Sequence, residues 1–375
     1  MKIAIDTFGC NHAKSGHGSY VTNFIQNIPE ENLSCFELLG FELDRYSFNS
    51  GRDITFKSAK LSDDAKSIQK FHEKKIEKLI LKNNYDYVIF PAAENALPLT
   101  FKKYKGIAIV NTIISSVLKT QPKKEKKLLK GLKNIQIIIA ASNFIKEDLL
   151  ALGISDEKIK VIHNGIDHKT FYPIMNIDST IVNISPFAIK RPYFIYGSTL
   201  SAAEKKHIEL IKAFEIFKEK TGLPHRLVLA GNDGEYSEKI HKVAFNSKYA
   251  SDIFITGYFP PKDFSMLYAG AELCIFPSVK EGVGLPILEA MACGIPVLCS
   301  NEGALKEIGG NCPLYFNSNK PDEIADKIEQ CISDKKLRKK MSFEGIVWAS
   351  EFTPEKTVQE TIDLISKDFK KTLNG

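Results

Sequence analysis

The feature that most constrains this fold is a repeated alternation between short β-branched runs and longer amphipathic stretches. Buried strands that alternate with helices predict parallel sheets covered on both faces. The rhythm occurs twice, and 375 residues exceed the roughly 250–300 that one core supports. The sequence therefore predicts two doubly wound, Rossmann-like α/β domains. The predicted strands are KIAID, YDYVIF, GIAIVN, IQIIIAA and KIKVIHN in the first half, and YFIYGS, RLVLAG, DIFITG, AELCIFPS and IPVLCS in the second.

The predicted domain boundary falls near FYPIMNIDST. Pro173 lies there, and helical and strand periodicity is lost up to Ile181. We expect a first domain over residues 1–172 and a second over residues 173–353. The stretch 354–375 is predicted to form a final helix, capped by Thr353.

The composition excludes several classes of protein. Hydrophobic content of 43% and charged content of 26% are ordinary for a soluble globular protein, and the net charge of +6 is too small for a dedicated nucleic-acid binder. No apolar run reaches the roughly 18 residues that a membrane span needs, and MKIAIDTFGC lacks the features of a signal peptide. The seven cysteines include no Cys-x-x-Cys spacing, which favours a reduced, cytoplasmic setting without a zinc site.

The most informative stretch is PSVKEGVGLPILEAMACGIP. It reads as the end of a strand, a glycine loop from Glu281 to Gly284, and a helix with Pro286 in its first turn. A helix N-terminus carries unpaired amides and partial positive charge, and glycines let that backbone approach a phosphate closely. The stretch therefore predicts a diphosphate site that needs no metal.

Two carboxylates, Glu281 and Glu289, bracket this predicted site. Carboxylates accept hydrogen bonds from sugar hydroxyls, so the two residues suit a transferred sugar at one end and a ribose at the other. Read without their neighbours, they are also compatible with ordinary surface glutamates.

The same stretch closely resembles the signature of retaining glycosyltransferases of family four, also called glycosyltransferase group one. The match covers Pro-Ser, the two glutamates, Gly-Leu-Pro, Glu-Ala-Met-Ala-Cys-Gly, the following Pro-Val, and Glu307. The resemblance implies a GT-B fold, in which two facing Rossmann-like domains enclose a cleft. It also implies that Glu281 contacts the donor sugar and Glu289 the ribose. The loop amides expected to serve the sugar and phosphate belong to Gly282, Val283, Gly284 and Leu285.

GSTLSAAEKKHIELIKAFEIF resembles the family's glycine turn, here at Gly197, followed by a basic pair and a helix. The family usually has Arg-Lys-Asn where this chain has Lys205, Lys206 and His207. Cations at this place would stabilise the departing diphosphate, and we expect Lys206 to be essential and Lys205 to assist. The alternative is a pair of solvated lysines at a helix start.

Two further segments extend the resemblance along the nucleotide site. RLVLAGND supplies Gly231, and the next unit supplies Tyr258, whose backbone would frame the base and whose ring is equally suited to packing.

In the first domain, KSGHGSYVTNFIQNI resembles the glycine loop that faces the donor phosphates and the acceptor, which implicates Gly16 and Gly18. A structural turn is the alternative. Many members of the family carry a His-Asp pair after the strand that reads GIAIVN here, but this chain has no histidine there. Asn111, Thr112 or Ser115 are candidates for a substitute hydrogen bond, and the sequence does not decide between them.

Seven lysines lie between Lys119 and Lys133. Lys123, Lys126, Lys127 and Lys130 fall on one helical face, and Leu128, Leu129 and Leu132 on another. Such a helix suits weak, salt-sensitive contact with an anionic membrane, and equally suits a solvated basic surface.

The predicted activity is transfer of a sugar, with retention, from a nucleoside diphosphate to a hydroxyl of a glycan, a lipid-linked acceptor or a protein. No metal or other cofactor is predicted, and no nucleic-acid partner. The predicted location is cytoplasmic, at the inner membrane face if the lysines bind lipid. The alternative is a non-catalytic sugar-nucleotide-binding subunit, suggested by the missing His-Asp pair. An epimerase is a third option, which does not account for the PSVKEGVGLPILEAMACGIP run.

Overall fold

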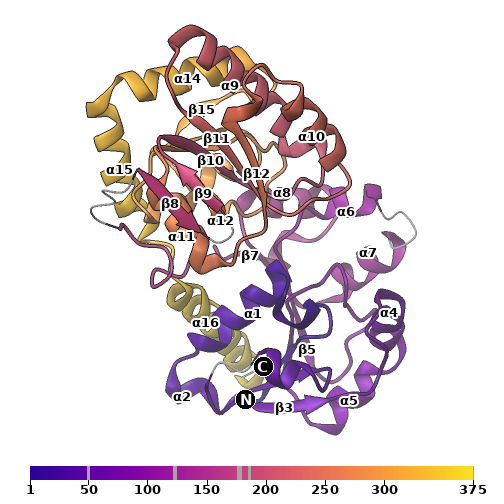
Figure 1. The fold of residues 1–375 in the computed structure, drawn as a ribbon. Coiled ribbons are helices and arrows are strands. Elements are labelled where there is room, and N and C mark those ends of the chain that lie inside the picture. The colour runs from indigo at the N-terminus through magenta and orange to yellow at the C-terminus, as the bar shows by residue number, and fades with distance from the viewer. Residues whose placement is uncertain (49–50, 121–124, 175–179, 185–186, 375) are drawn as a thin grey trace. The chain divides into compact units, whose positions relative to one another are not determined.

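The computed structural model describes residues 1–48, 51–120, 125–174, 180–184 and 187–374. It divides into two compact units (Figure 1), of which the first is Met1–Gly165 with Thr353–Gly375 and the second is Ile166–Phe352. The division at Gly165 precedes the predicted boundary at residue 172, and the chain returns to the first unit at Thr353. None of the described helices is both long and apolar enough to cross a membrane.

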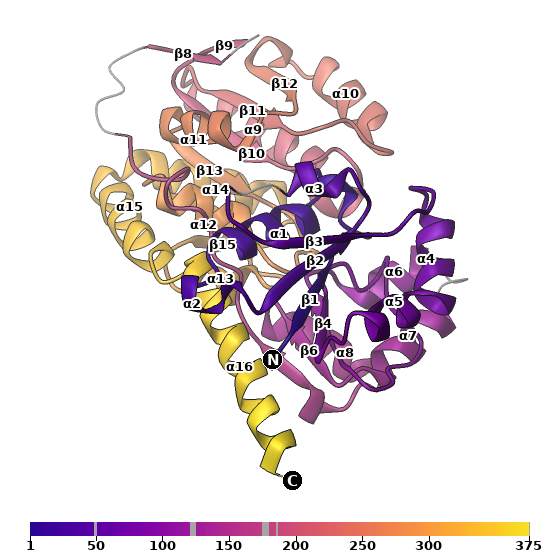
Figure 2. The same ribbon diagram turned by 90° about the horizontal axis from the view of Figure 1, so that it is seen from below.

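The first unit contains a seven-stranded sheet in the order β3-β2-β1-β4-β5-β6-β7, in which every pairing is parallel. Figure 2 shows β1 between β2 and β4, where the direction of the strand order reverses. The strands are β1 (Ile3–Asp6), β2 (Phe36–Gly40), β3 (Thr55–Ser58), β4 (Tyr87–Phe90), β5 (Lys105–Val110), β6 (Ile137–Ala140) and β7 (Ile159–Val161).

Helices cover this sheet because its strands are apolar on both faces. β1 and β4 are buried along their whole length, as the continuous β-branched runs predict. The helices are α1 (Gly16–Gln26), α2 (Glu30–Leu33), α3 (Asp44–Ser47), α4 (Ala65–Lys74), α5 (Ile76–Lys82), α6 (Ile114–Thr120), α7 (Glu125–Asn134), α8 (Asn143–Ala151) and α16 (Pro354–Asn374), with 3₁₀ turns η1 (Asn11–Ala13) and η3 (Asp156–Lys158).

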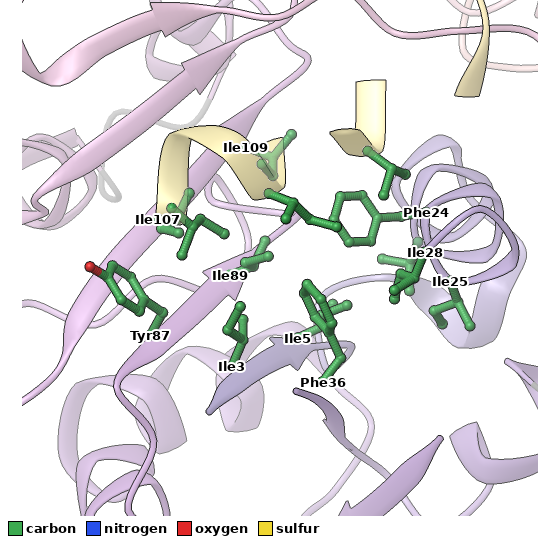
Figure 3. Packing of buried hydrophobic residues seen from close by; sticks show 14 of the residues in the cluster. Ile3, Ile5, Phe24, Ile25, Ile28, Phe36, Tyr87, Ile89, Ile107 and Ile109 are labelled. Atoms are coloured by element: carbon green, nitrogen blue, oxygen red, sulfur yellow. The ribbon is translucent and has the colours of Figure 1, made fainter. Parts of the chain in front are cut away.

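The core on one face of this sheet joins strand residues to α1 and to the end of the chain. Figure 3 shows Ile3, Ile89 and Ile107 of the strands and Phe24 of α1 as members of this cluster. The same cluster includes Val358, Ile362 and Ile365 of α16. Thr353 caps α16, as predicted, because its Oγ1 accepts a hydrogen bond of 3.2 Å from the Lys356 amide. The final helix is therefore an integral part of the first unit.

The second unit contains a parallel six-stranded sheet in the order β12-β11-β10-β13-β14-β15, which reverses between β10 and β13, and a separate antiparallel pair, β8 and β9. The strands are β8 (Ile181–Ile184), β9 (Phe187–Lys190), β10 (Tyr193–Gly197), β11 (Arg226–Ala230), β12 (Ile253–Gly257), β13 (Leu273–Phe276), β14 (Val297–Ser300) and β15 (Leu314–Phe316). The helices are α9 (His207–Thr221), α10 (Ser237–Phe245), α11 (Pro261–Gly270), α12 (Leu285–Ala292), α13 (Leu305–Gly309), α14 (Pro321–Ser333) and α15 (Lys335–Ala349), with η4 (Ala203–Lys205) and η5 (Ala250–Asp252).

Candidate functional site

The sheet topology of the second unit identifies where a ligand is expected. In open α/β sheets, ligands bind outside the carboxyl ends of the strands where the strand order reverses. That place lies between β10 and β13, and the segments that leave these strands carry Lys205, Lys206 and Glu281. The other predicted donor residues follow the same strands or β11 and β12: Gly197, Gly231, Tyr258, Gly282, Val283, Gly284, Leu285 and Glu289.

Two crossed ion pairs join the segments after β10 and β13. Lys205 Nζ lies 2.6 Å from Glu281 Oε1, and Lys280 Nζ lies 2.6 Å from Glu204 Oε1. Between them, the Val279 amide donates to the Glu204 carbonyl at 3.0 Å. The structure thus brings Lys205 of the predicted basic pair to the predicted glutamate, whereas Glu204 and Lys280 were not predicted from the sequence.

The Lys205–Glu281 pair is half-buried, and the Lys205 ammonium group has N–H donors that the pair does not use. The Lys205 and Glu281 side chains are 24% and 15% exposed. An ammonium group has three N–H donors, and this pair occupies one of them. Lys205 can therefore hold Glu281 in place and still donate to a phosphate oxygen.

Aromatic residues beneath the pair fix the Lys205 backbone. The hydroxyl of Tyr196, a fully buried residue of β10, donates to the Lys205 carbonyl at 2.8 Å. The rings of Tyr196 and His207 lie 4.7 Å apart between centroids. Burial lowers the pKa of His207 to about 4, so this residue is neutral where the family usually has an asparagine. The positive charge at this place therefore comes from the lysines.

Lys206 has an unusual backbone conformation. It joins η4 to α9 with φ of 57° and ψ of 31°, the left-handed region that costs a non-glycine residue about 1–2 kcal/mol. Its Nζ lies 3.2 Å from Glu209 Oε1 in the first turn of α9. A strained lysine at a helix N-terminus opposes both backbone preference and the helix dipole, which favours a functional reason for its presence.

A glycine that the sequence did not single out supports the Glu281 backbone. Gly303 follows β14 with φ of 65°, and a Cβ there would lie 2.8 Å from the Glu281 carbonyl oxygen. The next residue, Ala304, donates its amide to the same oxygen at 2.8 Å. This contact fixes the main chain at Glu281, from which the side chain reaches Lys205.

The predicted strand, glycine loop and helix start are confirmed. Gly284 has φ of 74° and lies immediately before α12, with Pro286 in the first turn of that helix. Glu289 follows in α12, half-buried, and burial raises its pKa to about 7. At neutral pH this carboxyl group is therefore poised between its charged and neutral forms.

The other donor-site residues differ in their surroundings. A Cβ on Gly197 would lie 2.7 Å from a Phe264 ring atom, and one on Gly231 would lie 2.0 Å from the Ser198 carbonyl oxygen. Close packing thus explains both glycines, and their donor-binding role stays a prediction. Tyr258 is 64% exposed, so packing does not explain its presence.

The first unit places its predicted residues at the carboxyl ends of β1 and β5. Gly16 and Gly18 lie in the first turn of α1, where Ser15 Oγ accepts from the Gly18 amide at 3.1 Å. A Cβ on Gly18 would lie 2.5 Å from Ala13 Cα, which accounts for this glycine as part of a tight turn. Asn111 Oδ1 accepts from Asn164 Nδ2 at 3.2 Å, while the buried Thr112 Oγ1 has no hydrogen-bond partner among the described residues.

Residues 125–133 of the lysine-rich stretch lie in α7, and two of the three leucines there are not available to a membrane. Leu128 is 6% exposed and Leu132 is fully buried, because this face of α7 covers the core of the first unit. Lys126 and Lys130 are exposed, whereas Lys127 pairs with Glu73 at 2.8 Å. Lys123 lies outside the described residues. A membrane contact here would therefore be electrostatic.

Among the described residues, no group of three or more His, Cys, Asp or Glu side chains is arranged to hold a metal ion. This observation does not test the predicted metal independence, which stays a prediction.

Comparisons with known proteins match both parts of the chain. Residues 179–348 match a family model described as glycosyl transferases group 1, and residues 50–170 match one described as glycosyltransferase family 4. The chain is 27% identical over 241 residues to O-antigen chain mannosyltransferase B of Escherichia coli, covering 64% of this chain and 62% of that protein. It is 24% identical over 242 residues to the capsular polysaccharide biosynthesis glycosyltransferase CapM of Staphylococcus aureus, covering 64% and 63%. The matches thus span less than two thirds of either relative.

Solved structures of similar fold cover nearly the whole chain. Anabaena Alr3699/HepE in complex with UDP and glucose aligns with a TM-score of 0.75 at 17% identity, covering 98% of this chain and 99% of that one. A glycosyltransferase from Rickettsia africae aligns with a TM-score of 0.71 at 19% identity, with the same coverage.

Proposed function

The chain belongs to the group 1 glycosyltransferases of family four and has their GT-B fold, and we propose that it transfers a hexose from a nucleoside diphosphate to an acceptor hydroxyl. The observation that carries the proposal is the Lys205–Glu281 pair at the reversal point of the second sheet, beside the glycine loop that begins α12. A diphosphate and a sugar need cations, amides and a carboxylate within reach of one another, and this place supplies all three.

Each residue has a distinct part in the proposed reaction. Lys206 and Lys205 bind the diphosphate and stabilise the charge that develops on it as the glycosidic bond breaks. Glu281 accepts hydrogen bonds from the sugar hydroxyls, and the α12 amides after Gly284 bind a phosphate. Glu289, in its charged form, accepts a hydrogen bond from a ribose hydroxyl. These groups supply the countercharge without a metal, so the rate is expected to be unchanged by EDTA.

The donor is proposed from the relatives and from the site together. One relative is named a mannosyltransferase, and one solved neighbour holds UDP-glucose. GDP-mannose and UDP-glucose are therefore the first donors to test. Retention is proposed from the family resemblance. A front-face displacement, in which the leaving phosphate takes the acceptor proton, would give it without a second carboxylate as nucleophile.

The acceptor is proposed to be a glycan, on a lipid carrier or free. The relatives are named for O-antigen and capsular polysaccharide synthesis. The exposed lysines of α7 suit an anionic surface near such an acceptor, through charge alone. Binding to anionic vesicles that vanishes at high salt is the expected result if the surface is used in this way.

A non-catalytic sugar-nucleotide-binding subunit is the second candidate. The absence of a histidine from residues 111–116, directly after β5, favours it, as does the hydrogen bond between Asn111 and Asn164. The strained Lys206 argues for catalysis, because simple binding of a nucleotide does not require it.

Thermal unfolding with UDP, GDP, UDP-glucose and GDP-mannose, followed by donor-turnover assays, tests these proposals. Ligands that bind the native state raise its stability, by about 2.7 kcal/mol at a hundredfold excess over Kd. We expect one base to stabilise the protein, and Lys206→Ala to remove most of that effect, whereas Glu238→Gln on the exposed face of α10 serves as a control. No stabilisation by any nucleotide would refute the proposed site, and binding without turnover would favour the second candidate.

A further inference from the structure

A histidine and a glutamate lie at the reversal point of the first sheet. His17 is in the first turn of α1, which follows β1, and Glu94 lies in the segment that follows β4. β1 and β4 are neighbouring parallel strands, and the strand order changes direction there. This is the place in the first unit where the topology of an open sheet favours a ligand.

The two segments are held tightly against each other. A Cβ on Gly9, in the segment after β1, would lie 2.8 Å from Ala92 Cβ and 3.1 Å from Ala96 Cβ. His17 Nε2 lies 2.5 Å from Glu94 Oε1, and the two side chains are 13% and 7% exposed. Burial alone would lower the pKa of His17, but the hydrogen bond and charge of Glu94 outweigh it and raise that pKa above its ordinary value. Glu94 therefore favours the protonated form of His17, and the two side chains are joined by one short contact.

One oxygen of this carboxylate is unsatisfied. Glu94 Oε2 is shielded from solvent and has no hydrogen-bond partner among the described residues. A buried acceptor without a partner is costly, and such groups in native proteins commonly have a functional explanation. Thr112 Oγ1, after the adjacent strand β5, is in the same condition. The segments after β4 and β5 thus each carry a shielded side-chain oxygen, Glu94 Oε2 and Thr112 Oγ1, with no partner in the part of the chain that the structure describes.

The surroundings indicate the kind of group that completes this site. His17 already engages Glu94 Oε1 at 2.5 Å, so a neutral hydroxyl that donates to the other oxygen suits this carboxyl group better than a second cationic partner. A neutral hydroxyl can donate to Glu94 Oε2 and accept from a neighbour, as Thr112 Oγ1 requires.

We propose that Glu94, positioned by His17, binds a hydroxyl of the sugar acceptor through its unsatisfied oxygen. This inference rests on the proposed function and gives it an acceptor-side residue in a chain that has no histidine at residues 111–116, directly after β5. Glu94 contacts the substrate, and His17 acts through Glu94 as a positioning residue. The first unit thus recognises the acceptor as a neutral polyol.

The test uses the full chain, its Glu94→Gln and His17→Gln variants, and Glu37→Gln as the matched control. Glu37 lies on β2 of the same unit, where its carboxylate accepts from the Tyr85 hydroxyl at 2.5 Å and is similarly buried. The acceptor probes are methyl α-D-mannopyranoside, methyl α-D-glucopyranoside and methyl β-D-N-acetylglucosaminide, titrated by saturation-transfer NMR with UDP or GDP present. Donor hydrolysis by water and sugar transfer to the bound glycoside are measured separately.

We expect the unmodified chain to bind at least one glycoside, and Glu94→Gln to weaken that binding and slow transfer at least tenfold. His17→Gln should raise KM for the glycoside with a smaller change in kcat. Nucleotide affinity and donor hydrolysis should stay within about twofold in Glu37→Gln, and should change far less than transfer in Glu94→Gln, because those steps need no acceptor. If Glu94→Gln does not fold, Glu94→Asp, which withdraws the carboxylate by one methylene, takes its place.

Two results would overturn the inference: no glycoside binds the unmodified chain, or transfer and hydrolysis change together in Glu94→Gln. Failure of the unmodified chain to bind any nucleotide is a different result, because it removes the proposed function through the second unit. Glycoside binding in the first unit is then judged by NMR alone.

Discussion

The raised pKa of Glu289 makes a prediction about stability that can be tested without a substrate. Glu289→Gln keeps the shape of the side chain and removes its charge. The pKa of Glu289 is about 7 in the folded protein against an ordinary value of 4.5, because burial disfavours the carboxylate. A folded-state pKa above the unfolded one means that stability is fully present below about pH 4.5 and is lost as the pH rises toward 7.

The magnitude follows from the interval between the two values. At about 1.4 kcal/mol per pH unit, the interval from 4.5 to about 7 corresponds to about 3 kcal/mol. Solvent around the half-buried side chain reduces this figure, so we expect Glu289→Gln to be about 1–2 kcal/mol more stable than the unmodified chain at about pH 8. At about pH 4.5 the two proteins should agree within about 0.5 kcal/mol.

Urea unfolding, followed by tryptophan fluorescence, measures this difference. Trp348 is the chain's one tryptophan and lies in α15 of the second unit, where its Nε1 donates to the Ile308 carbonyl at 2.7 Å. Its emission therefore reports the unit that contains Glu289. A stability gain that is equal at both pH values would indicate packing instead of charge, and no gain at pH 8 would refute the reasoning. The exposed Glu238→Gln variant should show no gain at either pH.

Three further variants test the site. Glu281→Ala should lower kcat/KM at least ~10²-fold, the cost of one preorganised transition-state contact, and steady-state assays that show turnover close to that of the unmodified chain would remove this residue from the site. Lys206→Gly should raise the free energy of unfolding by about 1 kcal/mol, because the φ of 57° at this position suits glycine. The same variant should lose turnover. Turnover retained in kinetic assays would show that Lys206 has a structural role alone. Gly303→Ala should destabilise the protein by about 1–3 kcal/mol and lower turnover. At this position φ is 65°, and an added Cβ would lie 2.8 Å from the Glu281 carbonyl oxygen, which leaves no room for it. An unchanged urea midpoint and an unchanged rate would contradict this expectation.

The sequence predicts most of the buried strands because their apolar runs are continuous. All ten predicted runs contain a strand of the structure, including β1, β10 and β13. The strands that were missed are short or partly polar. β2 contains Glu37, β3 reads TFKS at a sheet edge, and β15 has three residues. Edge strands and interrupted strands need less apolar sequence, so periodicity alone does not identify them.

The sequence predicted which residues form the candidate site, but it did not predict which of them pair. Lys205 and Glu281 came from a resemblance, but their contact depends on β10 and β13 being neighbours, which local sequence does not encode. The His17–Glu94 pair could not be predicted for the same reason, because its members follow the neighbouring strands β1 and β4. Gly303 was missed because its importance comes from the Glu281 backbone that it meets.

The discontinuity of the first unit has a consequence for how the chain is made. Its core includes Val358, Ile362 and Ile365, which a ribosome adds only after the whole of the second unit. The second unit is continuous from Ile166 to Phe352 and can complete its core while the chain is still being extended. The unit translated first is thus the last to be finished, and a nascent or C-terminally shortened chain exposes an apolar surface that chaperones and proteases recognise.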